Sequence, residues 1–210
     1  MNLHEALYTT RAMRRLKPDP IPYEVQARIL DAAIRAPHVG EGWRFLLIDD
    51  RQVMAQLADL YAQASEAMFA QHGVDPASLA TMDTTYGRAA RSALYLVRHF
   101  AELPLLLIGV TQSRAGSAID AALWSAMLAA RAEGVGSAWT DILRGFCPDE
   151  VGALLGIPDG WHLQSVIPMG YPLGRWGRAE RTPVHEVAAR NSWTGDLGFT
   201  VPEPLWPEQG

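Results

Sequence analysis

The stretch from Ser117 to Glu133 limits the possible folds of this chain most strongly, because it is apolar almost all the way round a helix. Alanine, leucine and methionine recur on every side of it, together with Trp124. A surface helix normally keeps a wide polar face, whereas a helix that is apolar all round is buried. In a chain of 210 residues this pattern favours a place at the centre of a homodimer.

Helical periodicity predicts further helices around this one. We expect them near residues 2–9, 23–35, 52–71, 87–100 and 148–155. Short apolar runs bounded by turn residues predict four strands, at 43–48, 105–110, 136–142 and 162–169. The segment 72–86 contains Gly73, Pro76 and several small polar residues, so we expect a loop or an irregular lid there.

This order of elements predicts one α+β domain over residues 1–210, with a central mixed sheet flanked by helices. After Gly170 the chain is rich in Gly, Pro, Arg and Trp and shows little periodicity. Such a segment cannot form its own core, and we expect residues 188–210 to be an extended C-terminal tail. The surface that this part of the chain wraps would be the partner subunit, which makes the expected homodimer intertwined.

Charge and cysteine content argue against several classes of protein. A net charge of -5 is unlike the basic face that nucleic-acid-binding proteins carry. The apolar runs stop short of the roughly 20 residues that cross a bilayer, and the N-terminus lacks a signal pattern, so no membrane partner is expected. Cys147 is the only cysteine, which excludes an intrachain disulfide and a cysteine-based zinc site. We expect a cytoplasmic protein without a metal site.

Basic residues gather in two distant parts of the chain. They are Arg11, Arg14, Arg15 and Lys17 in one cluster and Arg175, Arg178 and Arg181 in the other. The planar guanidinium group of arginine donates to two phosphate oxygens at once. The clusters therefore indicate that two segments meet at one anion, with a solvated basic turn as the alternative for the first cluster.

Several motifs, in this order along the chain, resemble those of the nitroreductase family. TRAMRRLKPDPIP at 10–22 is similar to the family's opening, and RAPHVGEGWRF at 35–45 is similar to its next motif. AARAEGVGS at 129–137 resembles its helix-to-strand junction. IPMGYP at 167–172 and RTPVHEV at 181–187 resemble its closing motifs.

The resemblance implies an enzyme that binds FMN across the interface of a homodimer and uses NAD(P)H as co-substrate. The flavin carries the chemistry, so no catalytic side chain is expected. The acceptor would be a small molecule such as a nitroaromatic, a quinone or an activated alkene. The alternative is a flavin-sequestering protein, or a specialised member of the fold with altered or lost FMN chemistry.

The resemblance also implies roles for the arginines. Arg11 and Arg181 would hold the FMN phosphate, and Arg14 would lie near the ribityl chain or the pyrimidine edge. Arg178 either joins the phosphate site or belongs to a solvated tail. Arg15 is either a third contact or part of a structural surface pair.

Other positions would lie near the isoalloxazine ring. Pro37 and His38 would come from the neighbouring subunit, and His38 either hydrogen-bonds the flavin or packs. Trp139, Thr140 and Asp141 lie where relatives present a backbone N–H to flavin N5, and Trp139 is equally open to a core role. The loop before Trp43 is shorter than in relatives, which predicts a more open or differently shaped acceptor pocket with His38 and Glu41 as its polar groups.

Overall fold

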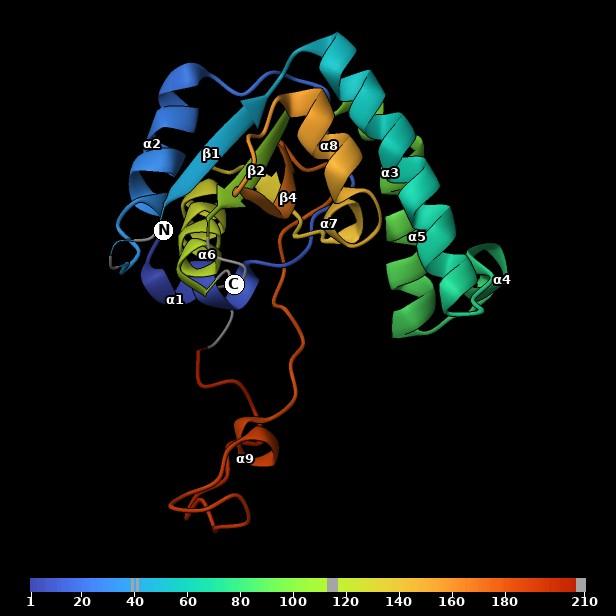
Figure 1. Ribbon diagram of the computed structural model, residues 1–210. Helices are drawn as coiled ribbons and strands as arrows, with labels where there is room; N and C mark the ends of the chain where they lie inside the picture. Colours follow the sequence, from blue (N-terminus) through green and yellow to red (C-terminus); the bar gives the residue numbers. More distant parts are fainter. Residues whose placement is uncertain (39, 41, 113–116, 207–210) are drawn as a thin grey trace. The chain divides into compact units, whose positions relative to one another are not determined.

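The computed structural model describes residues 1–38, 40, 42–112 and 117–206 (Figure 1). The chain divides into two compact units. The larger unit is Ala12–Arg175, and the smaller one combines Met1–Arg11 with the described part of Trp176–Gly210.

A four-stranded sheet lies in the larger unit. Its strands are β1 (Trp43–Ile48), β2 (Leu105–Thr111), β3 (Gly136–Ser137) and β4 (His162–Gly170), in the order β1-β2-β4-β3. All three pairings are antiparallel. The expected mixed sheet is therefore corrected: in the described part of the chain, parallel pairing is confined to one isolated bridge between Ala12 and Ser137.

The larger unit also contains helices. They are α2 (Tyr23–Ala33), α3 (Arg51–Gln71), α4 (Pro76–Thr81), α5 (Thr85–Arg98), a 3-10 turn η1 (Phe100–Glu102), α6 (Ser117–Ala132), α7 (Ile142–Phe146) and α8 (Pro148–Leu155). Local capping explains where several of them begin. The Asp50 carboxylate accepts the N–H groups of Gln52 and Val53 at the start of α3, both at 2.9 Å.

Two further sequence-based expectations for this unit were wrong in detail. The segment 72–86 contains α4, because Asp75 accepts the N–H groups of Ala77 and Ser78 and Pro76 occupies the first turn. The third strand is much shorter than 136–142. Only Gly136 and Ser137 form a ladder with β4, and α7 follows at Ile142.

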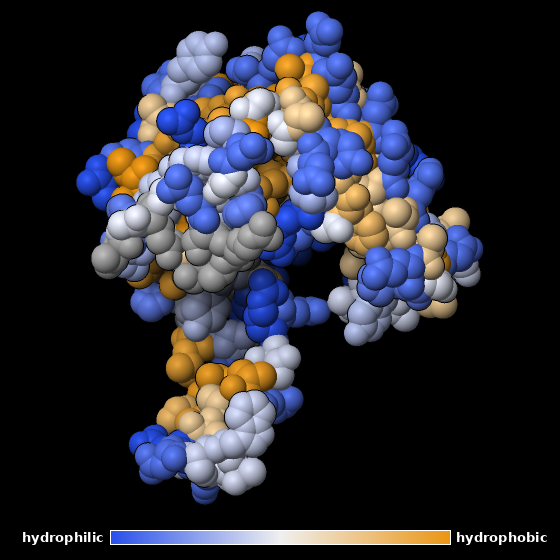
Figure 2. Space-filling view, viewed as in Figure 1, coloured by the Kyte–Doolittle hydropathy of each residue, from blue (hydrophilic) through white to orange (hydrophobic). Residues whose placement is uncertain are grey.

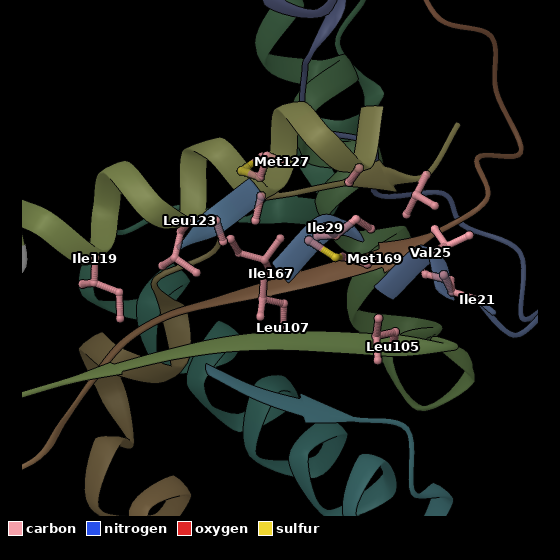
Figure 3. Close-up of a cluster of buried hydrophobic side chains, with 14 residues drawn as sticks. Ile21, Val25, Ile29, Leu105, Leu107, Ile119, Leu123, Met127, Ile167 and Met169 are labelled. Atoms are coloured by element: carbon pink, nitrogen blue, oxygen red, sulfur yellow. The ribbon is translucent and has the colours of Figure 1, made fainter. Parts of the chain in front are cut away.

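The core lies between the sheet and the helices α2 and α6 (Figure 3). Leu105 and Leu107 of β2 pack there with Ile119 and Leu123 of α6. A Cβ on Gly109 would lie 2.7 Å from a methyl group of Leu123, so α6 approaches β2 closely. The chain's own core thus explains most of the apolar character of α6.

The smaller unit contains α1 (Leu3–Thr9), as predicted, and a short helix α9 (Val184–Val187). The N–H of Ala179 donates to the carbonyl of Tyr8 at 2.9 Å, and the Tyr8 ring lies 5.7 Å from that of Trp206. Much apolar surface stays exposed on the C-terminal segment (Figure 2). Trp193 is 97% exposed.

None of the helices in the described ranges is long and apolar enough to span a membrane.

Candidate functional site

The segment Ala12–Lys17 runs along β3 and the residues that follow β4. The N–H of Met13 donates to the Ser137 carbonyl at 2.8 Å, and the N–H of Leu173 donates to the Arg15 carbonyl at 2.9 Å. Met13 is buried, while Arg14 is only partly covered. The backbone contacts therefore hold Arg14 at a defined place beside the end of β3.

Two glycines allow this close approach. A Cβ on Gly136 would lie 3.0 Å from the Met13 Cβ and 3.1 Å from a Leu16 methyl group. A Cβ on Gly170 would lie 3.1 Å from the Leu16 Cβ. Since these distances are tighter than ordinary van der Waals contact, glycine at both positions lets the arginine-bearing segment lie against the sheet.

Tyr61 contacts the predicted residue Thr140 and senses the charge of Arg14. Its hydroxyl lies 3.4 Å from the Thr140 hydroxyl, and its ring stacks on Phe100 with centroids 4.2 Å apart. Burial raises the pKa of Tyr61, while the Thr140 hydroxyl and the positive charge of Arg14 act in the opposite direction. The sequence contained no signal for Tyr61, because it lies on α3, far along the chain from both partners.

The raised pKa of Tyr61 predicts a stability difference in alkaline solution. The folded protein keeps the phenol proton to higher pH than the unfolded chain. The contribution of the protonated phenol to the free energy of unfolding is therefore complete below about pH 10, and it is lost as the pH rises through the folded pKa. Tyr61→Phe should cost about 0.5–1 kcal/mol at neutral pH through the lost hydrogen bond. It should also lose less stability than the parent as the pH rises further.

Urea unfolding followed at a series of pH values from neutral to alkaline measures both effects. Burial also raises the pKa of the Cys147 thiol, but this group titrates in both proteins and cancels in the comparison. If the free energy of unfolding fell equally steeply with alkaline pH in Tyr61→Phe and in the parent, the prediction would be contradicted.

The backbone of Thr140 is committed to the sheet. Its N–H donates to the Val166 carbonyl and its carbonyl accepts from the Val166 N–H, both at 3.1 Å, while Ala138 donates to Pro168. No acceptor for the N–H of Trp139 is found among the described residues. Of the three residues predicted to offer a backbone donor, Thr140 is therefore the one whose N–H is already used, and the N–H of Asp141, like that of Trp139, has no acceptor among the described residues.

The Arg15 side chain lies against an aromatic ring of its own chain. Its guanidinium carbon lies 4.9 Å from the centre of the Tyr95 ring on α5, a cation–π arrangement. Tyr95 in turn stacks on His99, with ring centroids 4.1 Å apart.

His38 packs on an aromatic residue. Its ring centroid lies 4.1 Å from that of Trp43, at the start of β1. The loop ends at Gly42, whose carbonyl accepts from the Gln112 N–H at 3.0 Å. Within the described part of one chain, no hydrogen bond, ion pair or ring contact joins Pro37 or His38 to Arg14 or Thr140. Glu41 lies outside the described residues.

Three of the predicted arginines belong to the smaller unit. Arg178 and Arg181 line a cavity of about 770 Å³ together with Leu7, Tyr8 and Phe199. The guanidinium of Arg181 donates to the Glu180 carbonyl at 2.8 Å. Arg11 lies near Gly177, where an added Cβ would come within 3.8 Å of its guanidinium. This unit thus brings Arg11 into the same compact group as the C-terminal arginines.

Comparison with known proteins identifies the family of the chain. The family model described as the nitroreductase family matches residues 7–171. The chain belongs to the nitroreductase family of oxidoreductases.

Individual relatives carry different reaction names. A 5,6-dimethylbenzimidazole synthase of Rhodospirillum rubrum is 28% identical over 86% of this chain and 90% of its own length. An NADH dehydrogenase of Thermus thermophilus is 26% identical over 84% of this chain and 90% of its own length. Among solved structures, iodotyrosine deiodinase bound to FMN and 3-iodo-L-tyrosine is similar in fold, with a TM-score of 0.65 and 20% identity over 86% of this chain and 95% of its own.

Proposed function

We propose that the protein is a cytoplasmic, FMN-dependent oxidoreductase that passes reducing equivalents from NAD(P)H to a small acceptor. The observation that carries the proposal is the available N–H of Trp139 beside the segment that bears Arg14. The solved relative with bound FMN and the relative named NADH dehydrogenase support the choice of cofactor and electron donor.

The residues present fit a flavin. A planar heterocycle with ring nitrogens and carbonyl oxygens needs hydrogen-bond donors at its edge, and Trp139 offers one on a rigid backbone. When bound, the flavin would supply hydride transfer between NAD(P)H and the acceptor. A cation at Arg14 would stabilise the negative charge that develops at the pyrimidine edge on reduction.

The remaining contacts come from other parts of the chain. We propose that Arg11 and Arg181 hold the phosphate, with Arg178 as a further cation nearby. Pro37, His38 and Glu41 would approach from the partner subunit and border the acceptor pocket. Arg15 is left out of the flavin site, because its side chain is engaged with Tyr95.

A second candidate is a specialised reaction on the same cofactor. The reaction names of the relatives, dimethylbenzimidazole synthesis and deiodination, favour keeping this possibility beside simple acceptor reduction. A protein that only sequesters flavin is the third outcome that the test below separates.

Purified protein decides between these functions. We expect it to carry FMN, to lose its visible flavin absorbance when NADH or NADPH is added without oxygen, and to recover the absorbance when a quinone is added. A flavin-bearing protein that neither nicotinamide reduces would contradict the proposal and favour sequestration or specialised chemistry. A colourless protein that cannot be reconstituted with FMN would exclude all three functions.

The homodimer is a separate prediction. Trp124 of α6 is 39% exposed, and Val187, Trp193 and Leu205 of the C-terminal segment expose more than half of their surface. Large exposed apolar side chains mark interaction surfaces. Light scattering at micromolar concentration should therefore give twice the mass of one chain, and a stable, folded monomer would refute the prediction.

A further inference from the structure

The backbone around Trp139 is fixed on both sides of the residue. The N–H of Ala138 donates to the Pro168 carbonyl at 3.2 Å, and Thr140 exchanges two hydrogen bonds with Val166. Trp139 lies between these anchors, and its partly buried side chain packs against the hydrophobic core. With the backbone fixed, only rotation about the side-chain bonds of Trp139 can change the position of its ring.

The Asp141 carboxylate restricts this rotation by binding the indole N–H. One oxygen, Oδ1, accepts the indole N–H of Trp139 at 2.9 Å. The same oxygen accepts the hydroxyl of Ser165, a fully buried residue of β4, at 2.5 Å. The other oxygen, Oδ2, pairs with Arg144, one turn further along, at 3.6 Å. The carboxylate is thus held by the strand and by α7, and it holds the indole.

This arrangement goes beyond what packing requires. A tryptophan that only filled the core would bury its ring and satisfy its N–H with any acceptor nearby. Here the acceptor is a carboxylate with two further partners, and the indole lies next to the residue's own available backbone N–H. The indole is therefore held in place beside the backbone N–H to which the proposed function assigns the cofactor.

We propose that Asp141 is a positioning residue that holds the Trp139 indole as a fixed aromatic wall for planar acceptors. The inference rests on the proposed function, since the wall needs a planar molecule to contact. It assigns a role to Asp141, Ser165 and Arg144 and narrows the acceptor to an aromatic or quinonoid compound that stacks on the indole.

Indole NMR tests the positioning without any flavin. The chain has seven tryptophans, and Trp139→Phe identifies the Trp139 signal by its loss. Asp141→Ala should accelerate hydrogen exchange at that indole N–H at least about tenfold, because a charge-assisted bond is removed. Asp141→Asn keeps an oxygen acceptor and should restore much of the protection. Ser165→Ala, which removes a different donor from the same oxygen, should leave it protected. Unchanged exchange in Asp141→Ala would overturn the positioning role.

Steady-state kinetics with the FMN-loaded protein tests the wall. The kcat/KM of Asp141→Ala for a planar quinone should fall about three- to tenfold, mainly through KM, since an aromatic contact contributes roughly 0.5–1.5 kcal/mol. Its kcat/KM for ferricyanide, which does not stack, should change less than twofold, and Asp141→Asn should recover the quinone KM. An equal loss with both acceptors would show that Asp141 is merely structural.

The role of Trp139 can be tested even if the proposed function is wrong. If the protein takes up no FMN, a planar quinone is titrated into the apoprotein and the same indole signals are followed. A shift of the Trp139 signal in the parent, weakened in Asp141→Ala, would support the wall in the absence of the cofactor. No shift at saturating quinone would overturn it.

Discussion

Arg14→Ala is expected to weaken FMN binding about ten- to a hundredfold, because losing a hydrogen bond from a charged donor costs roughly 1.5–3 kcal/mol. Arg14 is held beside β3 by the Met13 and Arg15 backbone bonds, so the variant should lose the cation without moving the segment. Fluorescence quenching of FMN titrated into the apoprotein measures the affinity. Arg15→Ala is the matched control and should bind FMN like the parent, since that side chain contacts Tyr95.

Riboflavin, which lacks the phosphate, separates the two groups of arginines. Arg14→Ala should weaken FMN and riboflavin to a similar extent, because its proposed contact is with the part that both share. Arg11→Ala and Arg181→Ala should weaken FMN alone. An Arg14→Ala protein that binds both flavins as tightly as the parent would remove Arg14 from the site.

Gly136→Ala is expected to destabilise the protein by about 1–3 kcal/mol and to lower its flavin content. The added Cβ would lie 3.0 Å from the Met13 Cβ and 3.3 Å from the Gly170 carbonyl oxygen, and neither atom is the end of a flexible side chain. Relief of this contact would lengthen the bond from Met13 to Ser137 and shift Arg14. Denaturant unfolding and the ratio of bound FMN to protein report the two effects.

Gly152→Ala provides the matched control for this substitution. Gly152 lies in α8, and an added Cβ has no atom within 4 Å. The same chemical change should therefore stabilise the protein by about 0.5–1 kcal/mol through the helix preference of alanine. If both variants unfold at the same denaturant concentration as the parent, the close approach at Gly136 does not constrain the site.

Several segments could be predicted from the sequence with good boundaries. The strands at Trp43–Ile48 and Leu105–Thr111 and the helix Pro148–Leu155 agree with their patterns. The shortness of the third strand could not be anticipated from its apolar pattern. Beyond Ser137 the pairing with β4 continues only as an isolated bridge at Thr140, and α7 then begins at Ile142. The small helix α4 depends on capping by Asp75, which the loop-like composition of the segment concealed.

The candidate site also has a part that the sequence predicted and a part that only the fold revealed. Arg14, Trp139 and Thr140 were predicted by resemblance, and the structure brings them to one end of β3 through the contacts of Met13 and Tyr61. Arg15 carried two interpretations that sequence could not separate. Only the fold placed Tyr95, on a helix far along the chain, next to the Arg15 guanidinium.

The sequence by itself determined which segments are apolar, where glycine permits a close approach and which motifs mark the family, because these properties belong to neighbouring residues. It also marked α6 as a helix to be buried. Only the tertiary structure decided that this helix is covered largely by α2 and the sheet of its own chain. Likewise, only the fold joined the carboxylate of Asp141 to Trp139, Ser165 and Arg144. The physical reason is that hydrogen bonds and packing depend on distances in space, and residues such as Asp141 and Ser165 become neighbours only when separate strands and helices pack together.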